Sequence, residues 1–206
     1  MNEWVWLAVA FLSGSVPYSL ILGKVLLKRD IRLYGDGNPG ATNLIRAGGG
    51  WWGAPAILLD GLKSAIPVGV AYWYDRPSML WMVVIAAAPV LGHAWSPFLR
   101  GKGGKGIASI FGVWTGLTLF EAPLILGVSM AAFYLILENS GWVVIFSEAV
   151  LGVFLWLYHP DVLLKAVWVI FFLLSVWKHR KDLRQRRLVR QKVSQFFMNT
   201  LQPKHK

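Results

Sequence analysis

The sequence predicts an all-α membrane protein with seven transmembrane helices, and two properties of the chain support this prediction. Of its 206 residues 56% are hydrophobic and only 15% are charged, and the mean hydropathy is +0.52. Long uncharged stretches leave too little polar surface for a disordered, collagen-like or solvated coiled-coil chain. A spanning helix needs about 20 mostly apolar residues, or about 17 when it is short. Charges and Gly/Pro clusters divide the chain into apolar segments on roughly this scale.

Seven candidate spans result from this division: residues 4–27, 52–74, 79–99, 107–120, 122–137, 142–158 and 162–177. The last four are short. The first lacks the basic start and the Ala-x-Ala site of a cleaved signal peptide, so we expect it to be retained. We assign residues 1–178 to a seven-helix membrane domain with cytoplasmic glycine-rich loops. We assign residues 179–206 to a basic tail, and we expect its part past Leu188 to be an amphipathic segment on the lipid surface.

Lysine and arginine assign the sides of the membrane, because basic loops stay in the cytoplasm. Residues 178–206 hold ten of the 21 basic residues against a single acid, and the loops at 28–50 and 100–105 are basic as well. We therefore place the tail and both loops in the cytoplasm. The N-terminal Met-Asn-Glu has no basic side chain and is placed outside. This arrangement requires an odd number of crossings, which seven satisfies.

The composition also indicates the partners and excludes several kinds of site. The basic charges adjoin an apolar segment, which favours membrane lipid over nucleic acid as the partner. The absence of cysteine excludes disulfides, iron–sulfur clusters and cysteine-bound zinc. The four histidines show no i,i+4 metal pair, no triad spacing and no His-x-x-x-x-Asp pattern of the acyl-CoA-dependent membrane acyltransferases. We expect no metal and no other cofactor.

The first cytoplasmic loop has the composition of a phosphate-binding cradle. It reads GDGNPGATN from Gly35 to Asn43, and Arg46 follows. Glycines let backbone N–H groups approach an anion, and the polar side chains add donors. The loop also matches G-x-G-x-x-G, but the buried strand of a dinucleotide fold does not precede it, so we reject that interpretation. The candidate phosphate-binding residues are Asp36, Gly37, Asn38, Gly40, Thr42 and Asn43, with Arg46 as the cation.

A second basic glycine loop follows the third candidate span. It reads KGGKG from Lys102 to Gly106, a short distance after His93. A Walker A loop needs a glycine where Leu99 stands and a Ser or Thr after the lysine, so nucleotide hydrolysis is unsupported. Glycines beside an ammonium let the backbone approach a phosphate while the charge is neutralised. The candidate residues here are His93, Lys102, Gly103, Gly104 and Lys105.

Asp60 and Lys63 are two charges three residues apart inside the second candidate span. A charge at the centre of a membrane costs about 2.5 to 3.5 kcal/mol on insertion scales, so we expect the two to pair and to face the bundle or a cytoplasmic cavity. A structural ion pair and direct substrate contact stay equal alternatives. Ser15, just before Val16 and Pro17, is a candidate for helix packing or for donation to a ligand.

Together these motifs resemble the bacterial acyl-phosphate–glycerol-3-phosphate acyltransferases. The match covers most of the chain and comprises Gly14-Ser15-Val16-Pro17, Asp30-Ile31-Arg32, residues 37–43, Leu59-Asp60 with Lys63, Leu91-Gly92-His93, and residues 102–106 with Ala108. The resemblance implies a seven-helix enzyme of the inner membrane. It would move an acyl group from acyl phosphate to the sn-1 hydroxyl of glycerol 3-phosphate, giving lysophosphatidate and phosphate. The enzyme that synthesises acyl phosphate becomes a candidate partner.

The resemblance also assigns candidate roles to individual residues. Lys105 and Arg46 would bind glycerol phosphate or stabilise developing charge, and His179, near the candidate binding residue Asp182, would position substrate. An acyl phosphate is an activated anhydride, so donors aimed at the oxyanion and at the departing phosphate can suffice without a protein nucleophile. We expect the substrate phosphate to accept the hydroxyl proton.

Three positions depart from the pattern of the family. The family usually has serine where Asp36 stands, a bulky residue such as phenylalanine where Gly101 stands, and asparagine where Asp182 stands. A carboxylate beside a bound phosphate repels it unless the carboxylate is paired with a cation or protonated. A catalytically divergent paralogue and a phosphate-ester transporter or binding subunit therefore stay as alternatives.

Overall fold

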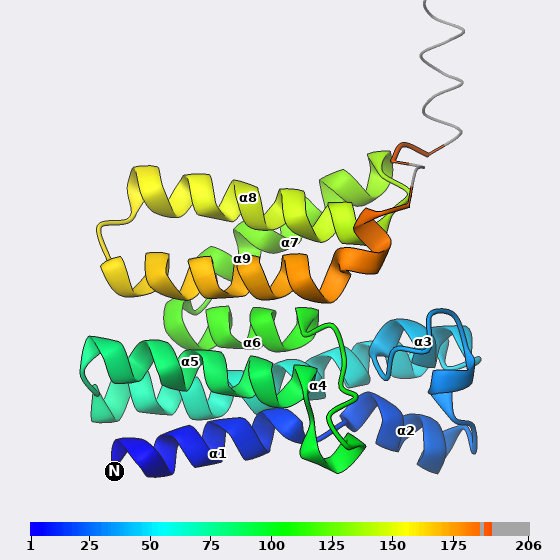
Figure 1. The fold of residues 1–206 in the computed structure, drawn as a ribbon, viewed down its shortest axis with the longest axis horizontal. Helices are drawn as coiled ribbons and strands as arrows, with labels where there is room; N and C mark the ends of the chain where they lie inside the picture. The colour runs from blue at the N-terminus through cyan, green and yellow to red at the C-terminus, as the bar shows by residue number, and fades with distance from the viewer. Residues whose placement is uncertain (186–187, 191–206) are drawn as a thin grey trace, which may run out of the picture.

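The computed structural model describes residues 1–185 and 188–190, and it confirms the all-α prediction (Figure 1). Its helices in chain order are α1 (Glu3–Ser15), α2 (Tyr18–Leu26), α3 (Ala41–Arg46), α4 (Gly50–Val70), α5 (Met79–Ala94), α6 (Ile107–Thr118), α7 (Glu121–Ile136), α8 (Ser140–Tyr158) and α9 (Val162–Leu183). Short 3-10 turns lie at Ile31–Leu33 and Pro97–Leu99, and a π turn at Ala71–Asp75 extends α4. Within the described residues, the extended backbone pairs at a single bridge, between Leu137 and Val189.

Most of the candidate spans have the length and hydropathy that a membrane requires. Five helical segments are long and apolar enough to cross it: Glu3–Leu26, Gly50–Asp75, Met79–Leu99, Ser140–Tyr158 and Val162–Leu183. The two other candidate spans correspond to α6 and α7, which are apolar but have only 12 and 16 residues. Large apolar side chains cover the outer faces, as Leu12, Leu124 and Val153 illustrate. Such a surface is stable in lipid, so the chain is a multi-pass membrane protein.

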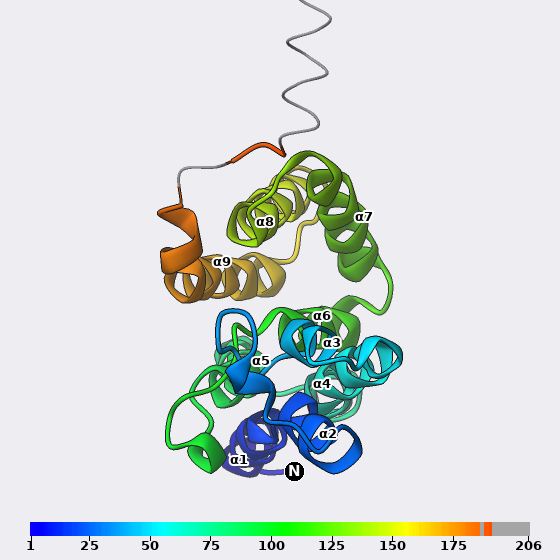
Figure 2. The same ribbon diagram turned by 90° about the vertical axis from the view of Figure 1, so that its right-hand side faces the viewer.

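The helices form two packed groups that meet at α6 (Figure 2). In the first group α1 packs against α5 and α4 packs against α6, and in the second α8 packs against both α7 and α9. Helix α6 also contacts α7 and α9, and α5 contacts α9. Trp114 of α6 meets Phe171 of α9 edge to face, with ring centroids 5.8 Å apart, and both side chains are fully buried. Packing of these aromatic rings joins the two groups into one core.

The first span is broken at Pro17, between α1 and α2. Proline has no N–H and disfavours the helical conformation of the residue before it, so Val16 takes an extended conformation with φ −65° and ψ 121°. The Val16 carbonyl oxygen then accepts a hydrogen bond from Nζ of Lys63 on α4, at 2.6 Å. The break therefore leaves a main-chain carbonyl free to accept a hydrogen bond inside the bundle.

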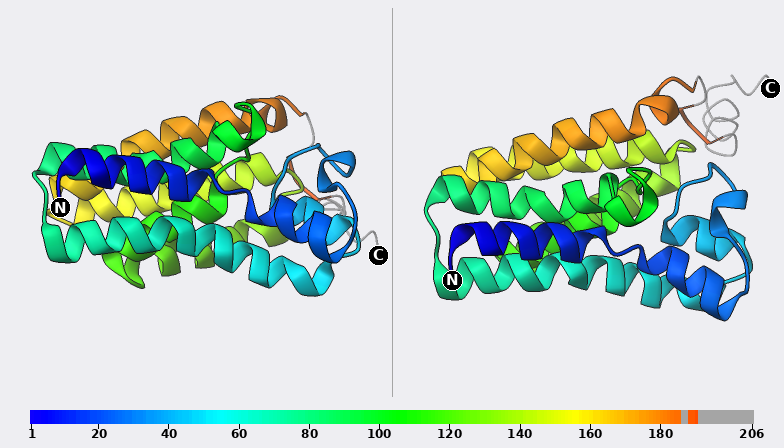
Figure 3. Two further views of the ribbon diagram at one scale, coloured as in Figure 1. Left: turned by 90° about the horizontal axis from the view of Figure 1, so that it is seen from below. Right: turned by 60° about the horizontal axis from the view of Figure 1, so that its bottom comes forward.

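The polar loops converge at one end of the bundle. The loop between α2 and α3, the loop between α5 and α6 and the C-terminal end of α9 all lie towards the end opposite the N-terminus (Figure 3). Helix α9 continues to Leu183, beyond residue 178, where we placed the end of the membrane domain. His179 and Asp182 are therefore helical residues of its last turns. The tail segment predicted to be amphipathic begins past Leu188, and apart from Val189 and Arg190 it lies outside the described residues.

Candidate active site

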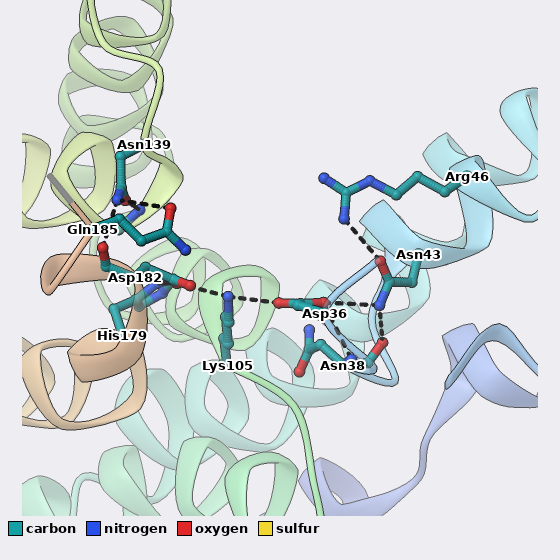
Figure 4. Close-up of polar contacts among 10 residues, drawn as sticks. Asp36, Asn38, Asn43, Arg46, Lys105, Asn139, His179, Asp182 and Gln185 are labelled. Carbon is teal, nitrogen blue, oxygen red and sulfur yellow. Dashed lines mark hydrogen bonds and ion pairs between the residues drawn. The ribbon is translucent and has the colours of Figure 1, made fainter. Parts of the chain in front are cut away.

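Lys105 is the centre of a polar cluster built from three distant parts of the sequence (Figure 4). Its Nζ lies 2.7 Å from Oδ2 of Asp36 and 2.7 Å from Oδ2 of Asp182. Asp36 lies in the loop between α2 and α3, and Asp182 lies on the last turn of α9. Lys105 itself lies just before α6, so one ammonium group connects both helix groups.

The partners of Lys105 determine its protonation and that of Asp36. Burial alone would raise the pKa of the Asp36 carboxyl, but the hydrogen bond and positive charge of Lys105, with bonds from Asn38 and Asn43, lower this pKa from 3.8 to about 2. Burial alone would lower the pKa of the Lys105 ammonium, but its hydrogen bonds and charge interactions with Asp182 and Asp36 raise it above its usual value. Lys105 and Asp36 are therefore both charged at neutral pH.

The glycine-rich loop is folded around the Asp36 carboxylate. Oδ1 of Asp36 accepts the Asn38 backbone N–H at 3.2 Å and Nδ2 of Asn43 at 2.9 Å. Nδ2 of Asn43 also donates to the Asn38 carbonyl at 2.9 Å, and Arg46 donates to Oδ1 of Asn43 at 3.2 Å. Gly37 has φ +74°, a conformation that glycine adopts without strain. The donors that we assigned to phosphate thus surround a carboxylate of the same loop, with Lys105 facing it.

A cavity of 570 Å³ lies beside this cluster. Its apolar wall comes from α4, α6 and α7 and includes Ile57, Leu58, Leu62, Phe111 and Met130. Of the predicted site residues, Asn38, Gly40, Thr42, Asp60, His93 and Lys105 line it. Three other predicted site residues that the structure describes, Arg46, His179 and Asp182, do not line the cavity. The cavity therefore combines a long apolar wall with the lysine of the polar cluster.

The predicted pairing of Asp60 with Lys63 is confirmed. Nζ of Lys63 lies 2.6 Å from Oδ1 of Asp60, and both side chains are buried. The same ammonium lies 3.0 Å from Nδ1 of His93 on α5, and Oδ2 of Asp60 accepts the Ser19 hydroxyl at 2.6 Å. Helices α2, α4 and α5 thus meet at a buried polar chain whose last member, His93, lines the cavity.

The second glycine loop packs directly on His93. The Gly104 N–H donates to the His93 carbonyl at 3.0 Å. A Cβ at Gly103 would clash with that same carbonyl, and a Cβ at Gly104 would clash with the imidazole. These two glycines are therefore needed for close approach of the loop to α5, while Lys102 is exposed. The same contact fixes the position of Lys105 next to the histidine.

Ser15 lies at a helix contact. Its hydroxyl donates to the Phe11 carbonyl at 2.7 Å, and its own carbonyl accepts the Ser96 hydroxyl at 2.6 Å. The sequence left two roles open for Ser15, helix packing and donation to a ligand. The observed contacts match helix packing.

His179 and Asp182 form a pair that the sequence analysis did not anticipate. Nδ1 of His179 lies 3.0 Å from the same Oδ2 of Asp182 that contacts Lys105. The imidazole is buried, and Nε2 has no hydrogen-bond partner among the described residues. The i,i+3 spacing on a helix is the signal that could have predicted this pair.

Two further residues hold the end of α9 and were missed. Asn139 accepts the Gly141 N–H as the N-cap of α8 and donates Nδ2 to the Asp182 carbonyl at 2.5 Å. Lys178 donates to the Ala94 carbonyl at 2.9 Å. An asparagine before a helix indicates a cap. Its second contact, across the fold, has no local signal in the sequence.

Comparison with known proteins places this geometry in a family. A family model described as glycerol-3-phosphate acyltransferase matches residues 4–190. Glycerol-3-phosphate acyltransferase 1 of Thermotoga maritima is 43% identical over 128 residues, which are 61% of this chain and 63% of that relative. Glycerol-3-phosphate acyltransferase of Methylobacillus flagellatus is 32% identical over 190 residues, which are 90% of this chain and 93% of that relative.

Solved structures agree with the sequence relatives. The crystal structure of PlsY, an integral membrane glycerol 3-phosphate acyltransferase, in its glycerol 3-phosphate form aligns with a TM-score of 0.83 at 26% identity, covering 95% of this chain and 98% of that chain. Its lysophosphatidic acid form aligns with a TM-score of 0.80, covering 90% and 94%. The chain therefore belongs to the glycerol-3-phosphate acyltransferase family.

Proposed function

We propose that this acyltransferase of phospholipid synthesis takes its acyl group from acyl phosphate and transfers it to the sn-1 hydroxyl of glycerol 3-phosphate. The products are lysophosphatidate and phosphate. One observation carries the proposal: Lys105 both lines the 570 Å³ cavity with its apolar wall and holds the centre of the polar cluster. An acyl phosphate has the same two-part character, an apolar chain joined to an anion.

The acyl chain is the part of the substrate that fits the apolar wall. Burying apolar surface stabilises by about 25 cal/mol per Å², so a chain along Ile57, Leu62, Phe111 and Met130 binds without polar contacts. Lys105 then receives the phosphate end. Arg46, exposed beside the glycine-rich loop, supplies the second cation for the glycerol phosphate.

Binding of a phosphate requires Lys105 to exchange partners. Asp36 and Asp182 both contact its ammonium. A phosphate group takes over one or both of these contacts, and the displaced carboxylates keep other donors: Asn38 and Asn43 for Asp36, and His179 for Asp182. The two acids therefore compete with the substrate for one cation, which lowers the affinity and does not block the site.

The chemistry needs no protein nucleophile, because the acyl phosphate is already activated. Lys105 stabilises the charge that develops on the departing phosphate. His179, oriented by Asp182, positions the glycerol hydroxyl for attack. The phosphate of the donor accepts the hydroxyl proton as the ester forms.

The topology follows from the distribution of charge. We place the N-terminus outside, the polar cluster and the C-terminal tail in the cytoplasm, and seven spans in the inner membrane, with α6 and α7 as the short ones. The end of the membrane domain then moves from residue 178 to Leu183, the last residue of α9. The enzyme that synthesises acyl phosphate is a partner on the cytoplasmic side, because its product is the donor.

The test uses purified protein in lipid bilayers with palmitoyl phosphate and glycerol 3-phosphate, and it follows lysophosphatidate and phosphate together. We expect equal amounts of both products from the wild type. Lys105→Ala and Arg46→Ala should each lower kcat/KM by about 100-fold or more. As a matched control, Arg180→Ala removes a cation that stacks on Trp177 outside the cluster and should keep full activity. A folded wild type that binds glycerol phosphate without releasing phosphate would instead be a binding subunit.

A further inference from the structure

The ammonium group of Lys63 has three protons and three acceptors. Nζ lies 2.6 Å from the Val16 carbonyl oxygen, 2.6 Å from Oδ1 of Asp60 and 3.0 Å from Nδ1 of His93. The carboxylate of Asp60 is held in turn by the Ser19 hydroxyl at 2.6 Å. A charged ammonium only donates hydrogen bonds. Each of its protons therefore has one acceptor, and the acceptor on the histidine is Nδ1.

This contact fixes the protonation of His93. Since Nδ1 accepts from Lys63, it carries no proton, and a doubly protonated ring would have no acceptor to offer the ammonium. In a neutral imidazole one nitrogen donates and the other accepts, so the proton is on Nε2. Lys63 thus leaves His93 with a single N–H group, on the nitrogen that faces away from the ion pair.

The N–H of His93 lies where the second glycine loop meets the cavity. A Cβ at Gly104 would clash with Nε2, so only a glycine lets the loop backbone pack this closely on the imidazole. Among the described residues Nε2 has no hydrogen-bond partner, and it is not one of the fully buried atoms that lack one, so it keeps accessible surface on the histidine that lines the cavity. The Gly104 N–H donates to the His93 carbonyl at 3.0 Å, which holds the residue before Lys105 against the histidine. Both His93 and Lys105 line the cavity. The cavity thus has a neutral donor next to its cation.

We propose that the Nε2–H of His93 donates to the carbonyl oxygen of the acyl phosphate and stabilises the oxyanion that forms there. This role rests on the proposed function. Lys105 neutralises the phosphate of the donor, and the carbonyl is the next group along the molecule, between the phosphate and the apolar chain. A preorganised N–H at that point stabilises charge that exists only during the reaction.

The reaction is balanced without proton transfer by the histidine. The glycerol hydroxyl oxygen bonds to the carbonyl carbon, and the π electrons of the carbonyl move onto its oxygen. When the carbonyl reforms, the bond from carbon to the phosphate oxygen breaks, and the phosphate leaves with the electron pair and takes the hydroxyl proton. His93 donates a hydrogen bond throughout. Lys63 and Asp60 touch no substrate and are positioning residues that act through His93.

Two substitutions of His93 separate a donor from a packing role. His93→Leu removes the N–H and should lower kcat about 100- to 1,000-fold, with KM for glycerol 3-phosphate within about threefold of the wild type. His93→Gln places an amide N–H near the position of Nε2 and should recover at least about tenfold in kcat over His93→Leu. His159→Leu, a histidine that pairs with Glu121 away from the cavity, is the matched control and should keep full activity.

The tautomer is tested without any substrate, by ¹⁵N NMR of histidine-labelled protein in lipid. The His93 resonances, identified by their absence in His93→Gln, should show an unprotonated Nδ1 and a protonated Nε2. Lys63→Met should allow the proton to occupy Nδ1 as well, and should lower kcat while KM for glycerol 3-phosphate holds. A proton on Nδ1 in the wild type would overturn the inference, even if the Lys63 variant fails to fold.

The outcomes for the two proposals are distinct. A wild type that makes no lysophosphatidate from palmitoyl phosphate overturns the proposed function, and the role of His93 toward the carbonyl with it. A wild type that makes product while folded His93→Leu turns over at the same rate overturns this inference alone. The same holds if His93→Gln, folded to the same melting temperature, is no better than His93→Leu.

Discussion

Asp36 and Asp182 lie near opposite ends of the chain yet share one ammonium group, since Oδ2 of each lies 2.7 Å from Nζ of Lys105. Two carboxylates with one negative charge each face a single positive charge on the lysine, so the cluster has a net negative charge. Lys105 is the cation that we propose as the binding partner of the substrate phosphate. Removing either acid therefore has consequences for substrate binding that can be measured.

Replacing Asp36 with serine should strengthen the binding of glycerol 3-phosphate. The substitution frees one contact of Lys105 and the donors of Asn38 and Asn43, and it removes a like charge from the phosphate. We expect KM for glycerol 3-phosphate to stay equal or to fall by up to about fivefold, because one exposed charge contributes at most about 1 kcal/mol. Steady-state kinetics at fixed palmitoyl phosphate measures this.

The control for this variant is Glu3→Gln, which removes one negative charge at the far end of the bundle. Its KM should match the wild type. A severe loss of glycerol phosphate affinity in Asp36→Ser would refute the repulsion argument and make the carboxylate part of the binding site.

Asp182 should tolerate asparagine better than leucine. Its Oδ2 contacts both Lys105 and Nδ1 of His179, and asparagine keeps one oxygen acceptor for them. Leucine releases both partners, and misplacing a catalytic group by about 1 Å costs roughly 100-fold in rate. We therefore expect kcat of Asp182→Leu to fall about 100-fold and that of Asp182→Asn to fall less than about tenfold. Equal losses in the two variants would show that the negative charge itself is required.

Narrowing the apolar cavity should change the preference for acyl-chain length. Gly127 of α7 lines the cavity, and a Cβ there would make an ordinary contact with the Phe111 ring, so a side chain can start at this position without a clash and Gly127→Leu is the chosen variant. If leucine displaces about two methylene groups, at about 0.8 kcal/mol each, kcat/KM with palmitoyl phosphate falls about tenfold. Decanoyl phosphate, which needs less of the cavity, should be affected less. An equal loss for both donors would place the acyl chain elsewhere.

The ion pair of Asp36 and Lys105 should persist in moderately acidic solution. The folded pKa of Asp36 is about 2, below its ordinary 3.8, so the stability that it contributes is fully present above about pH 4 and is lost as the pH falls towards 2. The difference in melting temperature between wild type and Asp36→Asn should therefore be constant from pH 7 to 5 and should vanish near pH 2. A difference that disappears near pH 5 would mean that the pair does not form.

The parts of the site that are local in sequence were predictable. The glycine loops stand out by their composition, and their assignment to phosphate stays a prediction, because closely spaced glycines serve close backbone packing as well as anion contact. The pairing of Asp60 with Lys63 followed from their i,i+3 spacing. The apolar stretches, and the charges and Gly/Pro clusters that interrupt them, likewise indicated the helical segments, since the thickness of the membrane sets the length of a spanning helix.

The contacts between distant elements were not predictable. Nothing near Lys105 in the sequence indicates that Asp36 and Asp182 flank it, because the fold of the loop between α2 and α3 places Asp36 and the packing of α9 places Asp182. The full length of α9 was not predictable for a different reason. The basic run from Lys178 suggests the start of a tail, yet Arg180 and Lys181 occupy the last turn of α9, where cations are favoured by the helix dipole.

The break between α1 and α2 determines which substitutions positions 16 and 17 can tolerate. Lys63 contacts position 16 through its main-chain carbonyl, so the side chain there is free to change among apolar residues. Position 17 is different, because proline keeps that carbonyl out of a continuous helix. The proline at position 17 thus supports, through the Val16 carbonyl and Lys63, the histidine tautomer that we propose, and substitutions at 17 should affect catalysis as those at 63 do.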